Sequence, residues 1–102
     1  MRPVLHGDVS SAARALLPVQ PELRARLCRK LIREAEMADE FVLKYGKLHP
    51  VFGNGSLMAS ARKRQLVPEP DFDNSDYCEC FVVVLNELLA LRSLEDGSVE
   101  LM

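Results

Sequence analysis

Apolar positions recur at helical spacing along this chain, and the most apolar stretch runs from Tyr77 to Arg92. On a helical wheel at about 100° per residue, its apolar side chains spread over roughly 200°, twice the width of a usual core stripe. We therefore expect a helix that is covered from several sides. The narrow strip that looks suited to water consists of Asp76, Glu79, Val83, Asn86, Glu87 and Ala90.

Capping residues and periodicity predict two helices in the first half of the chain. Asp8 is expected to cap a helix over residues 9–17, whose thin apolar edge indicates light packing. Pro21 opens a long second helix over residues 21–45, because a proline at the first turn loses no hydrogen bond. Gly46 is its predicted C-cap.

The second half of the chain begins with a glycine-bearing linker. Asn54 or Ser56 is predicted to cap a third helix over residues 57–65. Two prolines one residue apart then force residues 66–72 into an extended segment that crosses the core. Asp73 is the predicted cap of the last helix.

These elements predict an all-α fold, a small four-helix bundle-like domain with a Pro-rich extended crossing segment. The second and last helices are expected to be its main pair. At 102 residues the chain is too short for two cores, so we expect one domain over residues 1–102. The acidic tail at residues 97–102 is expected to be frayed.

Composition and sequence patterns also indicate the cellular compartment in which the protein lies. The longest uninterrupted apolar run, residues 81–85, is far shorter than the roughly 20 residues that cross a bilayer. The first residues lack the apolar region of a signal peptide. Three cysteines, an odd number, favour reduced thiols. We therefore expect a cytoplasmic protein that does not enter a membrane.

The width of the last apolar helix supplies the leading functional hypothesis. A small bundle has too little apolar surface to cover 200° of one helix, and an uncovered apolar face marks a protein contact. The sequence therefore predicts a non-catalytic protein–protein interaction module that forms a homodimer or binds another protein. The predicted interface residues are Cys78, Val82, Leu85 and Leu89.

The linker carries a candidate anion site. Glycines that feed a helix N-terminus aim free amides at one point, which suits a phosphate or a carboxylate. The residues concerned are Gly53, Asn54, Gly55 and Ser56, with His49 within reach. The alternative is that the glycines only make the turn and Asn54 or Ser56 caps the helix. The stretch has neither a P-loop pattern nor a nucleophile elbow.

Two basic clusters raise the alternative of a nucleic-acid-associated protein. They consist of Arg24, Arg26, Arg29, Lys30 and Arg33, and of Arg62, Lys63 and Arg64. Such clusters neutralise phosphates. The net charge is −2, however, and no aromatic residue is interleaved for base stacking. About ten residues separate the second and third helices, too many for a helix-turn-helix motif. Nucleic acid is therefore possible as a partner but not favoured.

Catalytic and metal chemistry find little support. Only His6 and His49 are available as bases, and neither has a recognisable nucleophile nearby in sequence. Cys78 and Cys80 lie about 200° apart on a helix, so they are not expected to ligate the same metal ion. Glu34 falls on the apolar side of the second helix and is expected to pair with Lys30 or with an arginine from another helix. We expect no enzyme activity, no metal and no cofactor.

Several stretches resemble a small uncharacterised family of alphaproteobacterial proteins. They are the opening RPVLHGDVSSAARAL, the linker HPVFGNGSLMASA and the segment PEPDFDNSDY, and the resemblance covers most of the chain. It implies an all-α fold. It transfers no functional residue.

Overall fold

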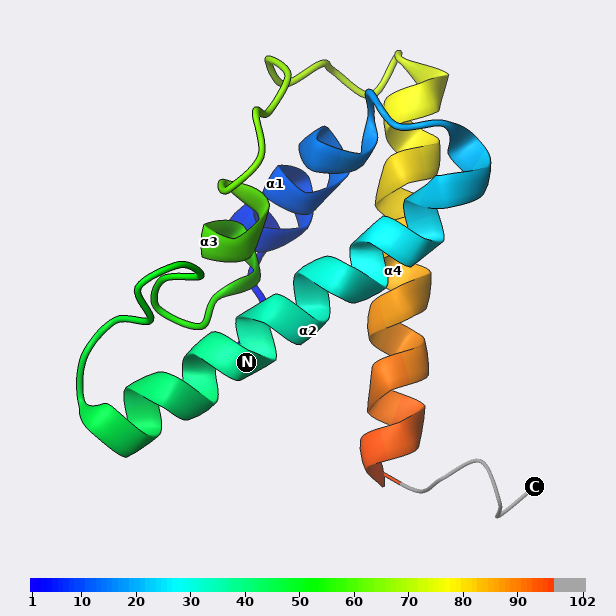
Figure 1. Cartoon of the computed structure of the whole chain (residues 1–102). Helices are drawn as coiled ribbons and strands as arrows, with labels where there is room; N and C mark the ends of the chain where they lie inside the picture. The colour runs from blue at the N-terminus through cyan, green and yellow to red at the C-terminus, as the bar shows by residue number, and fades with distance from the viewer. Residues whose placement is uncertain (97–102) are drawn as a thin grey trace.

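The computed structural model describes residues 1–96, which form four helices and no strand (Figure 1). The helices are α1 (His6–Leu16), α2 (Pro21–Tyr45), α3 (Leu57–Ala61) and α4 (Ser75–Asp96). The predicted all-α fold is confirmed. The prediction of a frayed tail falls on residues 97–102, which lie outside the described residues.

The short helix α1 lies at the centre of the packing. Eight of its eleven residues are buried, and it contacts α2, α3 and α4. The expectation of light packing is therefore wrong, and so is the expectation that α2 and α4 form the main pair. The reason is the size of the side chains. Ala12, Ala13 and Ala15 let neighbouring helices approach closely, so that a thin edge of methyl groups fills the available space.

Helices α2 and α4 cross and then diverge (Figure 1). The bounds of α2 are those predicted. Gly46 adopts φ = 69° and its amide donates to the carbonyl of Val42 at 2.8 Å, as expected of a left-handed C-cap. Because the two helices splay apart, the second half of α4 has neighbours on only part of its circumference.

Helix α1 begins earlier than predicted, at His6, and this changes the role of Asp8. Its carboxylate lies in the first turn, where Oδ2 accepts a hydrogen bond from the Leu5 amide at 2.8 Å. The other oxygen, Oδ1, accepts from the amide of Met58 in α3 at 2.8 Å. One carboxylate therefore binds the N-terminal amides of two helices.

The start of α4 is displaced by one residue from the prediction. Asn74, not Asp73, is the cap, because its Oδ1 accepts from the Tyr77 amide at 3.0 Å. The amide of Asp73 instead donates to the Asp71 carboxylate in a turn before the helix.

Helix α3 is capped by Ser56, whose Oγ accepts from the Ala59 amide at 3.0 Å. It ends at Ala61, four residues before the predicted end, because the chain turns there and Arg64 reaches back to α2. The extended segment 65–71 follows, held by a bond from Arg14 Nε to the Val67 carbonyl at 2.7 Å.

Candidate functional site

An apolar stripe runs along the outer side of α4. Val82, Leu85 and Leu89 are 54%, 47% and 65% exposed, and Cys78 on the same line is half-buried. The inner side of the helix is covered by the core, which includes Tyr77, Cys80 and Val84, all fully buried. We refer to Cys78, Val82, Leu85 and Leu89 as the outer stripe. It is the set of residues that the sequence analysis nominated as an interface.

The strip of α4 that was predicted to face water, from Asp76 to Ala90, is exposed only in part. Val83 packs against the core, and Glu87 is half-buried in an ion pair with Arg29. That side of α4 faces α2. Asn86 and Ala90 of the strip are exposed as predicted, so the exposed sector of α4 is wider than expected and also includes the apolar outer stripe.

A groove of about 490 Å³ follows one edge of the outer stripe. Its far wall is formed by the N-terminal segment and the first turns of α1, and we refer to it as the α1–α4 groove. Leu5 on this wall is 71% exposed. The residues that line the groove are Val4, Leu5, His6, Val9, Leu85, Leu88, Leu89 and Arg92.

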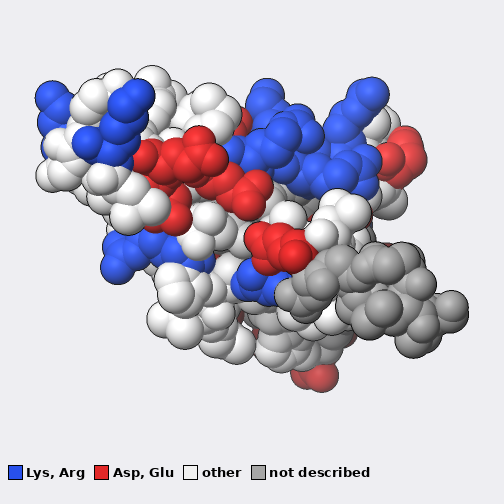
Figure 2. Space-filling view, turned by 90° about the horizontal axis from the view of Figure 1, so that it is seen from below, with Lys and Arg blue, Asp and Glu red and all other residues white. Residues whose placement is uncertain are grey.

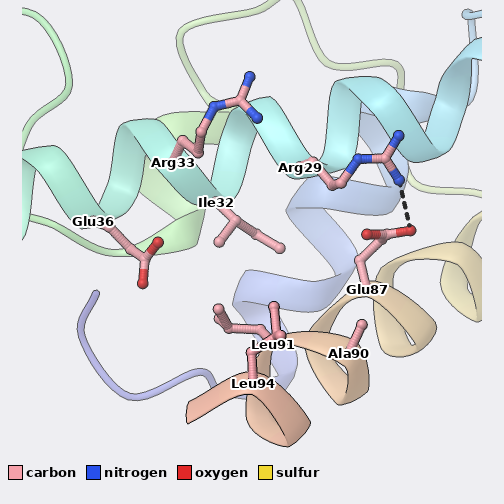
Figure 3. Close-up of a pocket in the computed structure, with 8 residues that line it drawn as sticks. All are labelled: Arg29, Ile32, Arg33, Glu36, Glu87, Ala90, Leu91 and Leu94. Carbon is pink, nitrogen blue, oxygen red and sulfur yellow. Dashed lines mark hydrogen bonds and ion pairs between the residues drawn. The ribbon is translucent and has the colours of Figure 1, made fainter.

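A second hollow lies between the diverging halves of α2 and α4 (Figure 3). The Arg29 Nη1 to Glu87 Oε2 ion pair, 3.1 Å long, closes one end of it, and Ile32, Leu91 and Leu94 provide apolar surface. Its volume of about 200 Å³ is below the range of roughly 300–1,000 Å³ that is typical of small-molecule sites. This hollow is therefore too small to hold a typical organic ligand.

Arg24, from the first basic cluster, is an internal residue. Its Nε donates to the carbonyls of Leu16 and Val19, and its two terminal nitrogens bind the Asp76 carboxylate at 2.7 and 3.0 Å. It also donates to the Leu17 carbonyl at 2.9 Å. These bonds tie the end of α1 to the start of α4. The hydrogen bond from Arg24 lowers the pKa of Asp76 from its ordinary value.

Arg64, from the second cluster, is also used internally. It binds Glu34 through two bonds of 2.6 and 3.0 Å, and Ser60 Oγ donates to the same carboxylate at 3.2 Å. The predicted pairing of Glu34 with an arginine is thus confirmed. Burial alone raises the pKa of Glu34, but the bonds and charge of Arg64 outweigh it and hold this pKa below its ordinary value.

Several members of the basic clusters remain at the surface. Arg26, Lys30 and Arg33 are exposed along one side of α2, beside the apolar Leu23 and Leu27, and we refer to these three as the basic face. Arg62 and Lys63 are exposed after α3. Figure 2 shows Lys and Arg side chains in a broad patch on one side of this view and in smaller groups elsewhere, with acidic side chains between them. Arg29 pairs with Glu87.

The predicted anion site already has an occupant from the chain itself. Gly53 and Gly55 adopt φ = 83° and 93°, and Ser56 caps α3 as the alternative interpretation expects. The Met58 amide that would meet an anion is bound by Asp8. His49 Nδ1 accepts from the amides of Val51 and Phe52. The local geometry favours the capping interpretation, and anion binding stays a prediction.

Gly55 also marks a close approach between the linker and α2. A Cβ atom at this position would lie 2.7 Å from the Cα atom of Asp39, which is too short for a real contact. Only glycine fits at this position without moving α2.

The three cysteines are free thiols in different settings. Cys28 and Cys80 are buried, and burial raises the pKa of Cys28 to about 12. The Cys78 thiol donates to the Phe72 carbonyl at 3.1 Å. Among residues 1–96, no group of three or more His, Cys, Asp or Glu side chains is placed to hold a metal ion.

Sequence reasoning missed the wall of the α1–α4 groove. Leu5 and His6 precede the expected first helix, and no pattern in the sequence places them beside α4. The ring of His6 lies 6.0 Å from that of Phe81, which shows how closely this segment follows α4.

Comparison with known proteins gives one match. The model of a family described as a domain of unknown function, DUF7742, matches residues 2–88. No curated protein matches the chain, and no solved structure does. The resemblance to an uncharacterised family is thereby confirmed, whereas the alphaproteobacterial origin stays a prediction. None of the helices in the described part of the chain is both long enough and apolar enough to span a membrane.

Proposed function

Because the chain belongs to the DUF7742 family, a domain of unknown function, we propose its role from its own geometry: a non-catalytic protein–protein interaction module that self-associates through the outer stripe. The observation that carries this proposal is the exposure of Val82, Leu85 and Leu89 on one line of α4. Scattered apolar residues on a surface are ordinary, but a continuous line beside an apolar groove is typical of a contact surface.

The groove adds to the contact surface on one side only. Leu5 and Val4 extend the apolar area from α4 onto the N-terminal segment, next to Leu85 and Leu89. A partner on the outer stripe therefore meets two walls and not a single convex helix. Shape of this kind favours a defined orientation over loose hydrophobic contact.

The states of the titratable groups support a non-catalytic role. A general acid needs a raised pKa, but the pKa of Glu34 is lowered by Arg64. A nucleophilic thiol needs a lowered pKa, but that of Cys28 is raised to about 12. The Nδ1 atom of His49 is occupied by two backbone amides. We place the protein in the cytoplasm, where its three free thiols stay reduced.

Sedimentation velocity at micromolar concentration tests the proposal. We expect a wild-type dimer with a Kd on the order of 10 µM, since a contact made through one face of one helix lies at the weak end of specific interfaces. Leu89→Glu is expected to abolish the dimer. Leu43→Glu is the matched control, since Leu43 is 80% exposed on α2, away from the outer stripe.

Two outcomes overturn the proposal. One is a wild-type species that stays at 11.4 kDa across the micromolar range. The other is loss of the dimer in Leu43→Glu to the same degree as in Leu89→Glu, which would place the contact elsewhere.

The basic face supports a second candidate, a nucleic-acid-associated protein. Arg26, Lys30 and Arg33 make no ion pair within the described residues, so their charges are available to phosphates. Titration with duplex and single-stranded DNA at low salt tests this candidate. Binding that weakens steeply with salt, and that Arg26→Glu with Arg33→Glu removes, supports it. Absence of any salt-sensitive binding excludes it.

A further inference from the structure

We propose that the second copy binds antiparallel, with the outer stripe of one α4 against that of the other about a two-fold axis that crosses the stripe midway between Val82 and Leu85. This inference rests on the self-association proposed above and specifies its geometry. Helix α4 runs along one side of the molecule (Figure 1), and beside its outer stripe stands the N-terminal segment that forms the far wall of the α1–α4 groove.

The spacing of the outer stripe carries the first step. Its four residues are separated by four, three and four positions, which is the spacing of the contact line in a coiled coil. An antiparallel two-fold pairing centred between residues 83 and 84 places Val82 opposite the partner's Leu85. It also places Cys78 opposite the partner's Leu89. Because the symmetry repeats each pair, four successive layers are apolar on both sides.

The flanking positions agree with this register. On one side Glu79 faces the partner's Asn86, an amide that can donate to the carboxylate. On the other side Phe81 faces the partner's Leu88, next to the α1–α4 groove. No like charges meet in either flank.

The ends of α4 decide between antiparallel and parallel pairing. The start of α4 and the turn before it are acidic, with Asp71 and Asp73 in the turn and Glu79 in the helix, whereas Arg92 lies on the contact side near the other end. Within residues 1–96, Arg92 forms a surface ion pair with Glu95 at 3.0 Å, and such an exposed pair is broken at little cost in free energy. In the antiparallel pair Arg92 lies against the acidic start of the partner. In a parallel pair it meets Arg92 of the other copy, and the two acidic starts also meet.

The groove provides room beside the contact line. Leu5, 71% exposed at the far wall, stands next to Leu85 and Leu89. A second helix on the outer stripe covers this side chain as well. The antiparallel pair therefore buries an apolar residue that neither α4 nor the core covers.

Thiol crosslinking reads out the orientation, because the native chain carries its own reporter. Cys78 is in the outer stripe, while Cys28 and Cys80 are fully buried. In the antiparallel pair two Cys78 residues are eleven positions apart, or about 16 Å along the axis, beyond a disulfide. Leu89→Cys places a new thiol opposite the partner's Cys78.

We expect no crosslinked wild-type dimer on oxidation or with a short thiol crosslinker. Leu89→Cys is expected to crosslink efficiently, and Cys78→Ser with Leu89→Cys is expected to lose the crosslink. Serine keeps the donor to the Phe72 carbonyl that Cys78 supplies, so the fold of this control is preserved. Circular dichroism of each variant verifies helix content.

The opposite pattern overturns the inference. In a parallel pair Cys78 meets Cys78, so the wild type crosslinks, and the variant with Cys78→Ser and Leu89→Cys still crosslinks through position 89. A dimer in sedimentation with this pattern, or with no crosslink in Leu89→Cys, refutes the antiparallel geometry and leaves self-association standing. A monomer in sedimentation refutes both.

A charge reversal gives an independent measure. Arg92→Glu adds repulsion against the partner's acidic helix start, and we expect the Kd of the dimer to rise by about 3- to 10-fold. In a parallel pair the change replaces one like-charge contact by another, and the Kd stays within about twofold. The second result contradicts the antiparallel pair.

Discussion

Val82 and Val84 are the same residue type on the same helix, yet one is 54% exposed and the other is fully buried. Arg24 and Arg26 repeat this contrast on α2, where the first is buried in a network of hydrogen bonds and the second is exposed. The inner member of each pair holds helices together. The outer member has no role in the packing of the monomer.

This contrast explains why a cluster in the sequence is a poor guide to a surface. Of the eight basic residues in the two clusters, Arg24 and Arg64 serve internal carboxylates and carbonyls. Conversely, the apolar outer stripe of α4 does not belong to the core of the monomer. An apolar surface that the fold does not use requires another explanation, which is the basis for the proposed contact.

The largest expected effect comes from charging the two valines. Val84→Asp places a carboxylate in the core without a partner and is expected to lower the free energy of unfolding by more than about 4 kcal/mol. Val82→Asp is expected to change the free energy of unfolding by less than about 0.5 kcal/mol, because Val82 faces solvent in the monomer. Chemical denaturation, monitored by circular dichroism at a dilution where the monomer predominates, measures both.

The same two valines distinguish an effect on the stability of the monomer from an effect on dimer formation. Val82→Asp is expected to remain folded and to lose the dimer in sedimentation. A variant that unfolds, or one that is folded and still dimeric, breaks the contrast between the two faces of α4.

The arginine pair gives the next largest effect. Arg24→Leu leaves the carbonyls at the end of α1 without their donor and is expected to cost about 2–4 kcal/mol. Arg26→Leu, the matched control two residues away, is expected to stay within about 0.5 kcal/mol of the wild type. If thermal or chemical unfolding shows the same loss of stability for both variants, the burial of Arg24 does not determine how much it contributes to the free energy of unfolding.

Acid unfolding tests the inner carboxylate Glu34. Its pKa in the folded protein is lowered, so its stabilising contribution is present above the unfolded pKa of about 4.3 and is lost as the pH falls through the folded pKa. Glu34→Gln is expected to cost about 1–2 kcal/mol at pH 7 and to reduce the loss of stability between pH 5 and about pH 2. An unchanged pH profile would contradict this assignment.

The smallest effect is expected at Tyr77. Its ring is fully buried between Phe72 and Phe81, and its hydroxyl has no hydrogen-bond partner in the described part of the chain. Tyr77→Phe removes this unsatisfied group, so stability is expected to be unchanged or to rise by up to about 1 kcal/mol. A loss of more than that in chemical denaturation would show that the hydroxyl is satisfied in solution.

Much of the fold was predictable because its signals are local. The bounds of α2 follow from Pro21 and Gly46, and the Ser56 cap follows from the glycine-bearing linker. The central position of α1 was not predictable from the width of its apolar face. Small side chains such as alanine and serine allow neighbouring helices to approach closely, although each buries little apolar area. The cap of α4 was misplaced by one residue, since Asp73 and Asn74 are both good caps and the turn at Asp71 decides between them.

The candidate site was predictable in part. The width of α4 nominated the outer stripe, and its exposure agrees with that nomination. The α1–α4 groove was not predictable, because Leu5 reaches α4 only through the tertiary fold. For the same reason the sequence did not show that Asp8, fifty residues away, occupies the amide of Met58.

The carboxylate of Asp8 has a consequence for the stability of a helix other than its own. A helix of five residues is far too short to persist alone in water, because its nucleus costs more than its few bonds return. The stability of α3 therefore depends on its neighbours, among them α1, whose Asp8 accepts a hydrogen bond from the Met58 amide. In this sense α1 acts as a template for α3, because it supplies the acceptor for an amide in the first turn of that helix.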